Sequence, residues 1–171
     1  DVPSLALGSG LVTPLDLTAA YAVFPSLGYR VAPRGILSVQ NASGDLVHRV
    51  HIEREQILSP DVAFQMVSML ADVVDTGTGA AARSLGVRFP AGGKTGTTND
   101  FKDAWFVGFS SGLVTGVWVG FDQPDSIAPD AFGARYALPI WADFMSRAAR
   151  IRPPQQFQPP ASVERVALCR V

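Results

Sequence analysis

The stretch GGKTGTTNDFKDAWFVGFSSGLVTGVWVGF, residues 92–121, decides the fold. It contains two apolar runs of strand length, residues 103–109 and 113–121, and a three-residue link, SSG, joins them. A link this short joins antiparallel neighbours. Both runs are apolar at nearly every position, so both faces of the sheet should be covered. The sequence therefore predicts an α/β (α+β) fold, a central antiparallel sheet with helices packed on its faces.

One covering helix is predicted near the start of the chain. Thr13 suits the N-cap, Pro14 suits the first helical position, and Asp16 completes a capping-box pattern. Gly28 is predicted to end this helix. The predicted buried face consists of Leu17, Ala20, Tyr21 and Phe24.

Two more helices are predicted further along the chain. One begins after Ser59, and its apolar residues recur at helical spacing. The other covers residues 139–150. The first is predicted to bury Val62, Met66, Met69, Leu70 and Val73. The second is predicted to bury Ile140, Trp141, Phe144, Met145 and Ala148.

A surface hairpin is predicted between the first two helices. Residues 36–40 and 46–50 have strand character, and the polar residues 41–45 (NASGD) separate them.

The chain is predicted to hold one structural unit, residues 1–152, followed by a Pro-rich extended tail or linker, residues 153–171. It starts at Asp1 without a Met and ends two residues after Cys169, so it is expected to be part of a longer protein.

Composition excludes several classes of function. The 171 residues carry 14 Lys+Arg against 15 Asp+Glu with no basic cluster, so nucleic acid is not expected as a partner. No apolar run is long enough to span a bilayer, and a membrane anchor is expected only in a segment outside this chain. With Cys169 as the only cysteine, neither an internal disulfide nor a cysteine-rich metal site is possible. No metal or cofactor is predicted.

Three other patterns suggest a catalytic, nucleotide-binding or metal site, but their sequence context does not support these functions. Residues 108–112 (GFSSG) fit the hydrolase elbow, but another strand follows where that motif needs a helix. Residues 77–82 (GTGAAA) fit a dinucleotide fingerprint but follow a predicted helix, so they are interpreted as a helix end and turn. His48 and His51 are three apart in or beside a predicted strand and should point to opposite faces, which does not favour a metal site.

The remaining candidate is Lys94-Thr95-Gly96-Thr97, at a predicted edge of the apolar sheet. An edge strand has unpaired backbone groups that can pair with an extended peptide. A lysine and two hydroxyl groups can bind a carboxylate. Gly96 permits a close approach to the backbone.

This motif and its context resemble the class A, bifunctional penicillin-binding proteins of bacteria. The resemblance rests on residues 93–100 (GKTGTTND) followed by residues 103–109 (DAWFVGF), and on shorter matches in the same order. Those shorter matches are residues 3–8 (PSLALG), 13–24 (TPLDLTAAYAVF) and 77–79 (GTG). The resemblance reaches to about Arg150 and implies the C-terminal portion of a β-lactamase/transpeptidase-like fold.

The resemblance implies a serine D,D-transpeptidase of peptidoglycan cross-linking, in which a serine of an S-x-x-K motif is acylated by a D-Ala-D-Ala stem peptide or by a β-lactam. By this resemblance, Lys94 and Thr97 of this chain would be catalytic residues, and Thr95, Gly96 and Thr97 would bind the substrate. The implied partners are stem peptides, β-lactam antibiotics and the upstream remainder of the same domain. The implied location is the periplasm, on the outer side of the bacterial cytoplasmic membrane.

The chain departs from the family in one respect: it contains neither S-x-x-K nor S-x-N. Its two lysines, Lys94 and Lys102, are preceded three residues earlier by Ala91 and Asn99. In the family both missing motifs lie upstream, so this fragment alone is expected to be inactive. Two alternatives stay open: an inactive penicillin-binding-protein-like module that binds peptides or a partner, and a serine β-lactamase, which the context of the motif fits less well.

Overall fold

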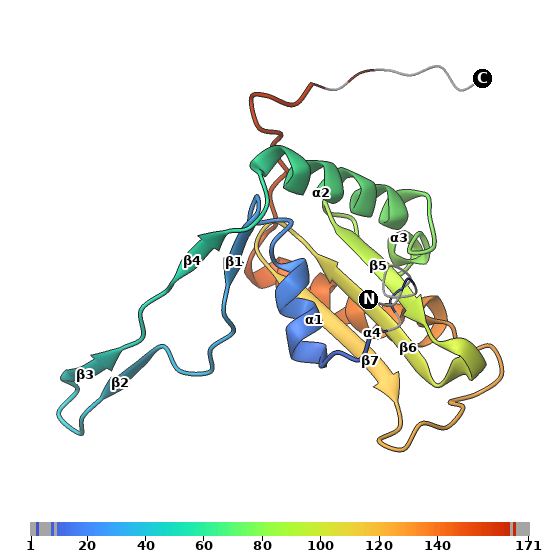
Figure 1. The fold of residues 1–171 in the computed structure, drawn as a ribbon, viewed down its shortest axis with the longest axis horizontal. Helices are drawn as coiled ribbons and strands as arrows, with labels where there is room; N and C mark the ends of the chain where they lie inside the picture. The colour runs from blue at the N-terminus through green and yellow to red at the C-terminus, as the bar shows by residue number, and fades with distance from the viewer. Residues whose placement is uncertain (1–2, 4–7, 9, 165, 167–171) are drawn as a thin grey trace.

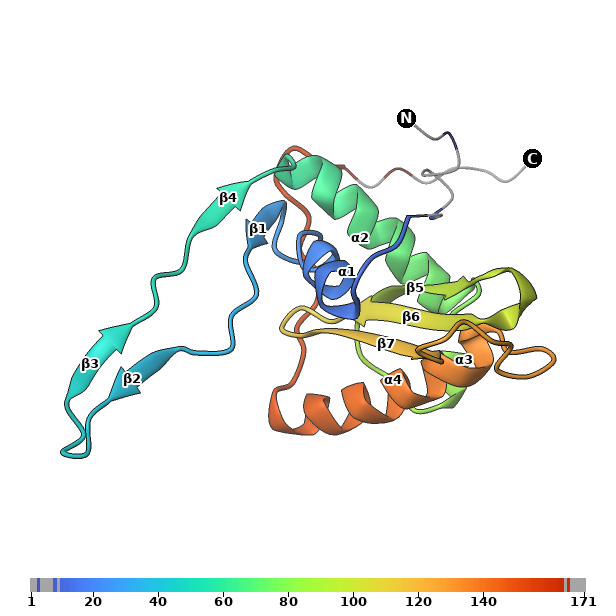
Figure 2. The ribbon, with the colours of Figure 1, turned by 60° about the horizontal axis from the view of Figure 1, so that its bottom comes forward.

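The computed structural model describes residues 3, 8, 10–164 and 166. Its centre is the three-stranded antiparallel sheet β5 (Gly92–Thr97), β6 (Asp103–Phe109) and β7 (Val114–Gly120), in that spatial order (Figure 1). Helix α1 (Pro14–Tyr21) lies on one face, and α4 (Gly133–Ile151) lies on the other (Figure 2). Helix α2 (Pro60–Asp75) runs along β5. The predicted antiparallel sheet with helices on both faces is confirmed.

The two faces of the sheet hold two apolar cores. On the α4 face, Phe106 packs against Trp141 with ring centroids 4.8 Å apart, and both side chains are fully buried. On the other face, Phe109 packs against Val67 and Leu70 of α2. Burying such large side chains is the main source of stability in a domain of this size. The α4-face core is the larger of the two and contains Val74, Ala82, Val87, Ala91, Phe106, Ala137, Leu138, Trp141, Ala142 and Met145.

Helix α1 begins as predicted and ends earlier. The Thr13 side chain accepts a hydrogen bond from the Asp16 backbone N–H at 3.1 Å, which confirms the cap. The prediction that the helix continues to Gly28 is wrong: it ends at Tyr21, and turns follow. Pro25 cannot donate the bond that would continue the helix, and Gly28, with φ +95°, closes a turn onto Val23 O at 2.8 Å. Ala20 is exposed, also against expectation.

Tyr21 lies half-buried at the end of α1. Its ring stands edge-on to Phe24, with centroids 5.6 Å apart. Burial raises the pKa of the Tyr21 phenol above its ordinary value, so the side chain stays neutral and contributes to packing.

Helix α2 exists where predicted, with Ser59 as its N-cap, but it presents a different face to the core. Of the predicted stripe only Leu70 is buried, and Val62 and Met69 are 46% and 54% exposed. The observed stripe is Ala63, Val67, Leu70 and Val74. Both stripes have helical spacing, so periodicity alone could not choose between them. The rotation of α2 about its axis is set by its contacts. Ala63 has a small side chain, and β5 approaches so closely that a Cβ on Gly92 would lie 3.3 Å from Ala71 N.

Helix α4 starts at Gly133, six residues before the predicted residue 139, and contains Pro139 in its interior. Trp141 and Met145 are buried as predicted. Ile140 and Phe144 were predicted to be buried and are half exposed, because the sheet contacts the adjacent stripe through Ala137, Leu138 and Ala142. Ala148 is of intermediate burial.

A two-part β arm extends away from the body of the molecule (Figures 1 and 2). Its outer part is the predicted hairpin, β2 (Ser38–Gln40) paired with β3 (Leu46–Arg49). Its inner part, β1 (Tyr29–Val31) paired with β4 (Arg54–Gln56), was not predicted, because three-residue strands carry too little alternation to detect. His48 lies in β3, whereas His51 follows the strand. Within the described residues no group of three metal-binding side chains occurs.

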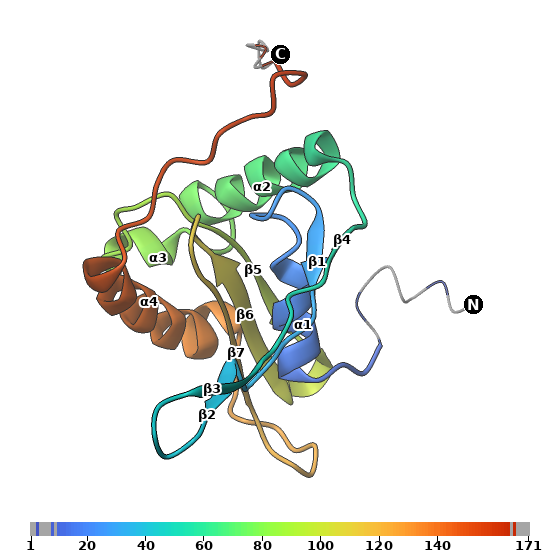
Figure 3. The ribbon, with the colours of Figure 1, turned by 90° about the vertical axis from the view of Figure 1, so that its left-hand side faces the viewer.

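The Pro-rich residues 153–160 are extended and lie against the body (Figure 3). Phe157 stands edge-on to Phe109 with centroids 5.7 Å apart, and the Gln155 N–H donates to Ser111 Oγ at 2.7 Å. The Ser162 hydroxyl donates to Asp61 at the start of α2. This segment therefore adds to the core around Phe109. Cys169 lies outside the described residues. Nowhere in the described part of the chain is a helix both long and apolar enough to cross a bilayer.

Candidate active site

The predicted motif lies on β5, which is an edge strand of the sheet. Its outer edge can be assigned from the hydrogen-bond pattern. The Thr98 N–H donates to Asp103 O at 3.1 Å, and bonded and non-bonded pairs alternate along an antiparallel ladder. Gly96 and Lys94 are therefore bonded to β6. The backbone N–H and C=O groups of Thr95 and Thr97 point to the outer edge, where an extended peptide could pair with them.

Lys94 and the two threonines project from opposite faces of β5. Thr95 is paired with Phe106 and shares its α4 face, whereas Lys94 is paired with Val107 on the α1 face. The exposed Lys94 side chain bends around the edge of the strand. Its Nζ donates to Thr95 O at 2.8 Å and to Thr95 Oγ1 at 3.2 Å. Within the described residues Lys94 has no carboxylate partner, so its positive charge is available to an anionic ligand.

Thr97 is held by the first residue of α4. The Gly133 N–H donates to Thr97 Oγ1 at 3.1 Å. Gly133 approaches β5 and β6 so closely that a Cβ there would lie 2.6 Å from Gly96 O and 2.3 Å from Trp105 O. The hydroxyl of Thr97 accepts this bond and keeps its own proton for a further partner. The N-terminus of α4 thus fixes the end of the motif strand.

The turn after β5 is also pinned. Trp118 Nε1 donates to Asp103 Oδ1 at 2.7 Å, and the Asp103 N–H donates to Thr98 Oγ1 at 2.8 Å. Two residues of this turn, Asp100 and Phe101, have φ of 61° and 55°, an uncommon conformation for residues with side chains. The Asp103–Trp118 bond joins β6 to β7, and the Asp103–Thr98 bond fixes the turn that connects β5 to β6.

Thr78 contacts the candidate site, although the sequence did not predict this contact. Its Oγ1 lies 2.9 Å from Thr95 Oγ1. Residues 76–80 form a turn between α2 and the short helix α3 (Ala81–Ser84), so residues 77–80 are a turn as interpreted from the sequence, whereas residues 81 and 82 begin α3. That turn nevertheless brings a hydroxyl group to the motif. The only available signal was the match of residues 77–79 to the family, which says nothing about a contact with β5.

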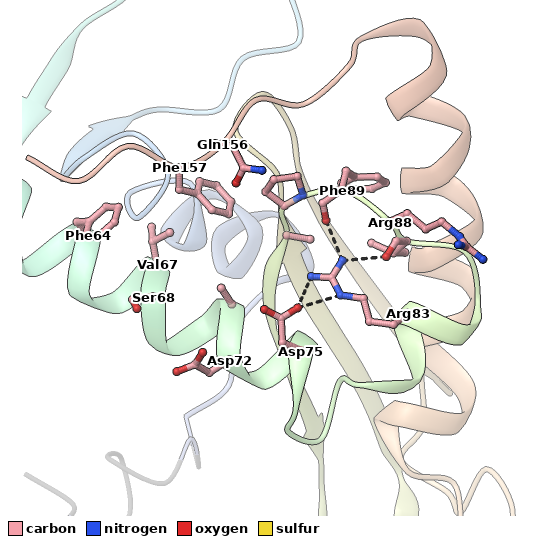
Figure 4. Close-up of a pocket in the computed structure, with 14 residues that line it drawn as sticks. Phe64, Val67, Ser68, Asp72, Asp75, Arg83, Arg88, Phe89, Gln156 and Phe157 are labelled. Atoms are coloured by element: carbon pink, nitrogen blue, oxygen red, sulfur yellow. Dashed lines mark hydrogen bonds and ion pairs between the residues drawn. The ribbon is translucent and has the colours of Figure 1, made fainter. Parts of the chain in front are cut away.

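The segment that leads into β5 is anchored by Arg83. Its guanidinium binds Asp75, and Nη1 also donates to Val87 O and Phe89 O, both at 2.8 Å (Figure 4). These residues line a hollow between α2, residues 87–91 and Phe157, and the K-T-G-T residues are not among those that line it. Because all the bonds of Arg83 are internal, we assign it to holding the chain that enters β5.

Comparison with known proteins agrees with this architecture. The family profile described as "Penicillin binding protein transpeptidase domain" matches residues 2–146. This chain belongs to the family of penicillin-binding protein transpeptidase domains.

The similar proteins are class A members of that family. The chain is 46% identical to penicillin-binding protein 1A of Aquifex aeolicus over 161 residues, which is 94% of this chain and 22% of that protein. It is 41% identical to the protein of the same name from Neisseria lactamica, again over 94% of this chain and over 21% of that protein. The chain thus spans about a fifth of the length of these relatives. The expected resemblance to class A penicillin-binding proteins is confirmed.

Solved structures show the same fold. The crystal structure of penicillin-binding protein 1A from Haemophilus influenzae superimposes with a TM-score of 0.86 at 28% identity, over 92% of this chain and 29% of that one. Penicillin-binding protein PonA1 from Mycobacterium tuberculosis superimposes with a TM-score of 0.70 at 25% identity, over 91% of this chain and 46% of that one. The predicted transpeptidase-like fold is confirmed.

Proposed function

We propose that this chain supplies the substrate-binding strand of a serine D,D-transpeptidase that cross-links peptidoglycan stem peptides and is acylated by β-lactams. The observation that carries the proposal is the open edge of β5. There the outward backbone groups of Thr95 and Thr97 adjoin the ammonium group of Lys94. A D-Ala-D-Ala peptide is extended and ends in a carboxylate, so it needs both a strand edge and a cation.

Each motif residue has a role in this proposal. Lys94 supports the charge network of the nucleophile and attracts the substrate carboxylate, and the hydroxyls of Thr95 and Thr97 donate to that carboxylate. The outward N–H of Thr97 forms half of the oxyanion hole, a kind of contact whose loss costs about 3–4 kcal/mol of transition-state stabilisation. Gly96 has no side chain, which allows a ligand to approach the strand closely and avoids crowding of β6, since a Cβ there would lie 3.2 Å from Trp105 Cβ.

The nucleophile belongs to another part of the protein in this proposal. No serine of this chain is followed three residues later by lysine, and no S-x-N is present. We assign both motifs to residues that pack beside β5 in the full-length protein. The proposed location is the periplasm, where peptidoglycan is cross-linked, with any membrane anchor in a segment other than this one.

Intact-mass spectrometry with benzylpenicillin tests the proposal. This chain and the full-length protein encoded by its gene are incubated separately with the antibiotic. An adduct equal to one intact penicillin on the full-length protein alone is expected, because opening the β-lactam ring acylates a serine without loss of atoms.

Absence of an adduct on the full-length protein would contradict the proposal and would favour an inactive peptide-binding module. An adduct on the isolated chain would place the nucleophile within this chain and would contradict the assignment of the missing motifs to another part of the protein. Rapid loss of the adduct would indicate a β-lactamase instead.

A further inference from the structure

Thr78 and the motif strand form a cluster of hydrogen-bond donors. Thr78 Oγ1 lies 2.9 Å from Thr95 Oγ1, which in turn lies 3.2 Å from Lys94 Nζ. The cluster joins residues 17 positions apart, from the turn after α2 and from β5. No described carboxylate lies within ion-pair distance of Lys94.

The cluster contains hydrogen-bond donor protons that have no acceptor within it. Lys94 can only donate, so the Thr95 oxygen accepts from it. One hydroxyl proton lies between Thr78 and Thr95, whichever of the two donates. Each threonine has one hydroxyl proton, so one of the two remains for another partner. The ammonium group uses two protons on Thr95 O and Oγ1 and keeps a third. The surplus of donors suits an anion.

The backbone around Thr78 is held in place, which makes its hydroxyl a fixed partner. The Gly79 N–H donates to Val73 O at 3.0 Å, and the Gly77 N–H also bonds the last turn of α2. A Cβ on Gly77 would lie 2.9 Å from Val73 Cα, and one on Gly79 would lie 3.4 Å from the Phe106 ring. Two glycines therefore let the turn pack against α2 and the core, so that Thr78 reaches Thr95.

We propose that Thr78 is a positioning residue for the substrate carboxylate: it fixes the orientation of the Thr95 hydroxyl so that the remaining proton of the pair points to the ligand. The proposal rests on the proposed function of β5. A threonine on an exposed edge strand can otherwise rotate about χ1, and the bond to Thr78 together with the Lys94 contact restricts it to one rotamer.

The test uses the full-length protein and the second-order rate constant for acylation by benzylpenicillin. Thr78→Val keeps the shape of the side chain and removes its hydroxyl, and we expect a loss of roughly tenfold, typical of one hydrogen bond in a charged site. Thr78→Ser should restore most of the rate. Thr76→Val is the matched control, because the Thr76 hydroxyl in the same turn bonds only Asp72 O of α2.

Two further measurements separate positioning from a structural role. The methyl ester of benzylpenicillin lacks the carboxylate, so Thr78→Val should slow its reaction much less than that of the acid. In a Thr95→Val background the Thr78→Val change should have little further effect, because the two hydroxyls act as a unit. Melting temperatures of all variants should match the wild type.

The outcomes are distinguishable. Equal losses with acid and ester, or additive losses in the double variant, would overturn the positioning role while leaving the transpeptidase proposal intact. An unchanged rate in Thr78→Val would do the same. A wild-type protein that forms no adduct would instead overturn the proposed function of β5.

Discussion

Replacing Lys94 by methionine in the full-length protein should slow acylation by benzylpenicillin on the order of 100-fold. The change removes a charge-assisted bond to the ligand, and among the described residues no other cationic side chain bonds the K-T-G-T motif. Lys94 is exposed and bonds only its neighbour Thr95. The substitution should therefore leave the melting temperature unchanged. Stopped-flow kinetics in which benzylpenicillin competes with a fluorescent penicillin, and a thermal melt, measure the two quantities.

Lys102→Met is the matched control, since Lys102 is the only other lysine of the chain and lies in the turn beyond β5. It should acylate at the wild-type rate. Equal effects of the two substitutions would show that general positive charge, and not the position of Lys94 on the open edge, attracts the antibiotic. A normal rate in Lys94→Met would remove Lys94 from the site.

Gly133→Ala should lower the free energy of unfolding by about 3 kcal/mol, the upper end of what overpacking usually costs. The added Cβ would meet two backbone oxygens, Gly96 O at 2.6 Å and Trp105 O at 2.3 Å, and neither can rotate away as a side chain could. The start of α4 must then move from β5, and the bond from the Gly133 N–H to Thr97 is lost. Urea unfolding followed by tryptophan fluorescence measures the loss, and acylation should slow as well.

Gly35→Ala is the control for this prediction. No heavy atom outside its chain neighbours lies within 4 Å of a Cβ at Gly35, and its φ is not positive, so an added methyl group meets open space. Its urea midpoint should match the wild type. If Gly133→Ala were as stable as Gly35→Ala and fully active, the close junction of α4 with β5 and β6 would not be what holds Thr97 in place.

The sheet could be predicted because its signal is local. Residues 103–121 contain two continuous apolar runs and one short link, and so short a link favours an antiparallel pair. The starts of α1 and α2 were also predictable, because Thr13 and Ser59 cap the turns that directly follow them. The start of α4 was not, because no side chain caps it. The open edge of the motif strand followed from its place at one end of the apolar region.

The helix faces could not be predicted because tertiary contacts chose them. In α2 the stripes beginning at Val62 and Ala63 both have helical spacing, and the contacts with β5 and with Phe109 of β6 bury the second one. In α4 the same competition left Ile140 exposed and buried Leu138.

The contact of Thr78 with Thr95 was beyond sequence reasoning for a similar reason. The turn of residues 77–79 is recognisable, but the β-strand it meets is 17 residues away along the chain. Local sequence patterns do not predict contacts between residues so far apart, and a threonine in a turn has no sequence pattern that predicts the partner of its hydroxyl group.

The most direct test of the central claim is the crystal structure of the full-length protein acylated by benzylpenicillin. We expect the antibiotic carboxylate about 3 Å from the hydroxyls of Thr95 and Thr97, and the acyl carbonyl oxygen at the same distance from the Thr97 N–H. A penicillin bound to a serine remote from β5, or with its carboxylate turned away from Lys94 and Thr95, would contradict the assignment of β5 as the substrate-binding strand.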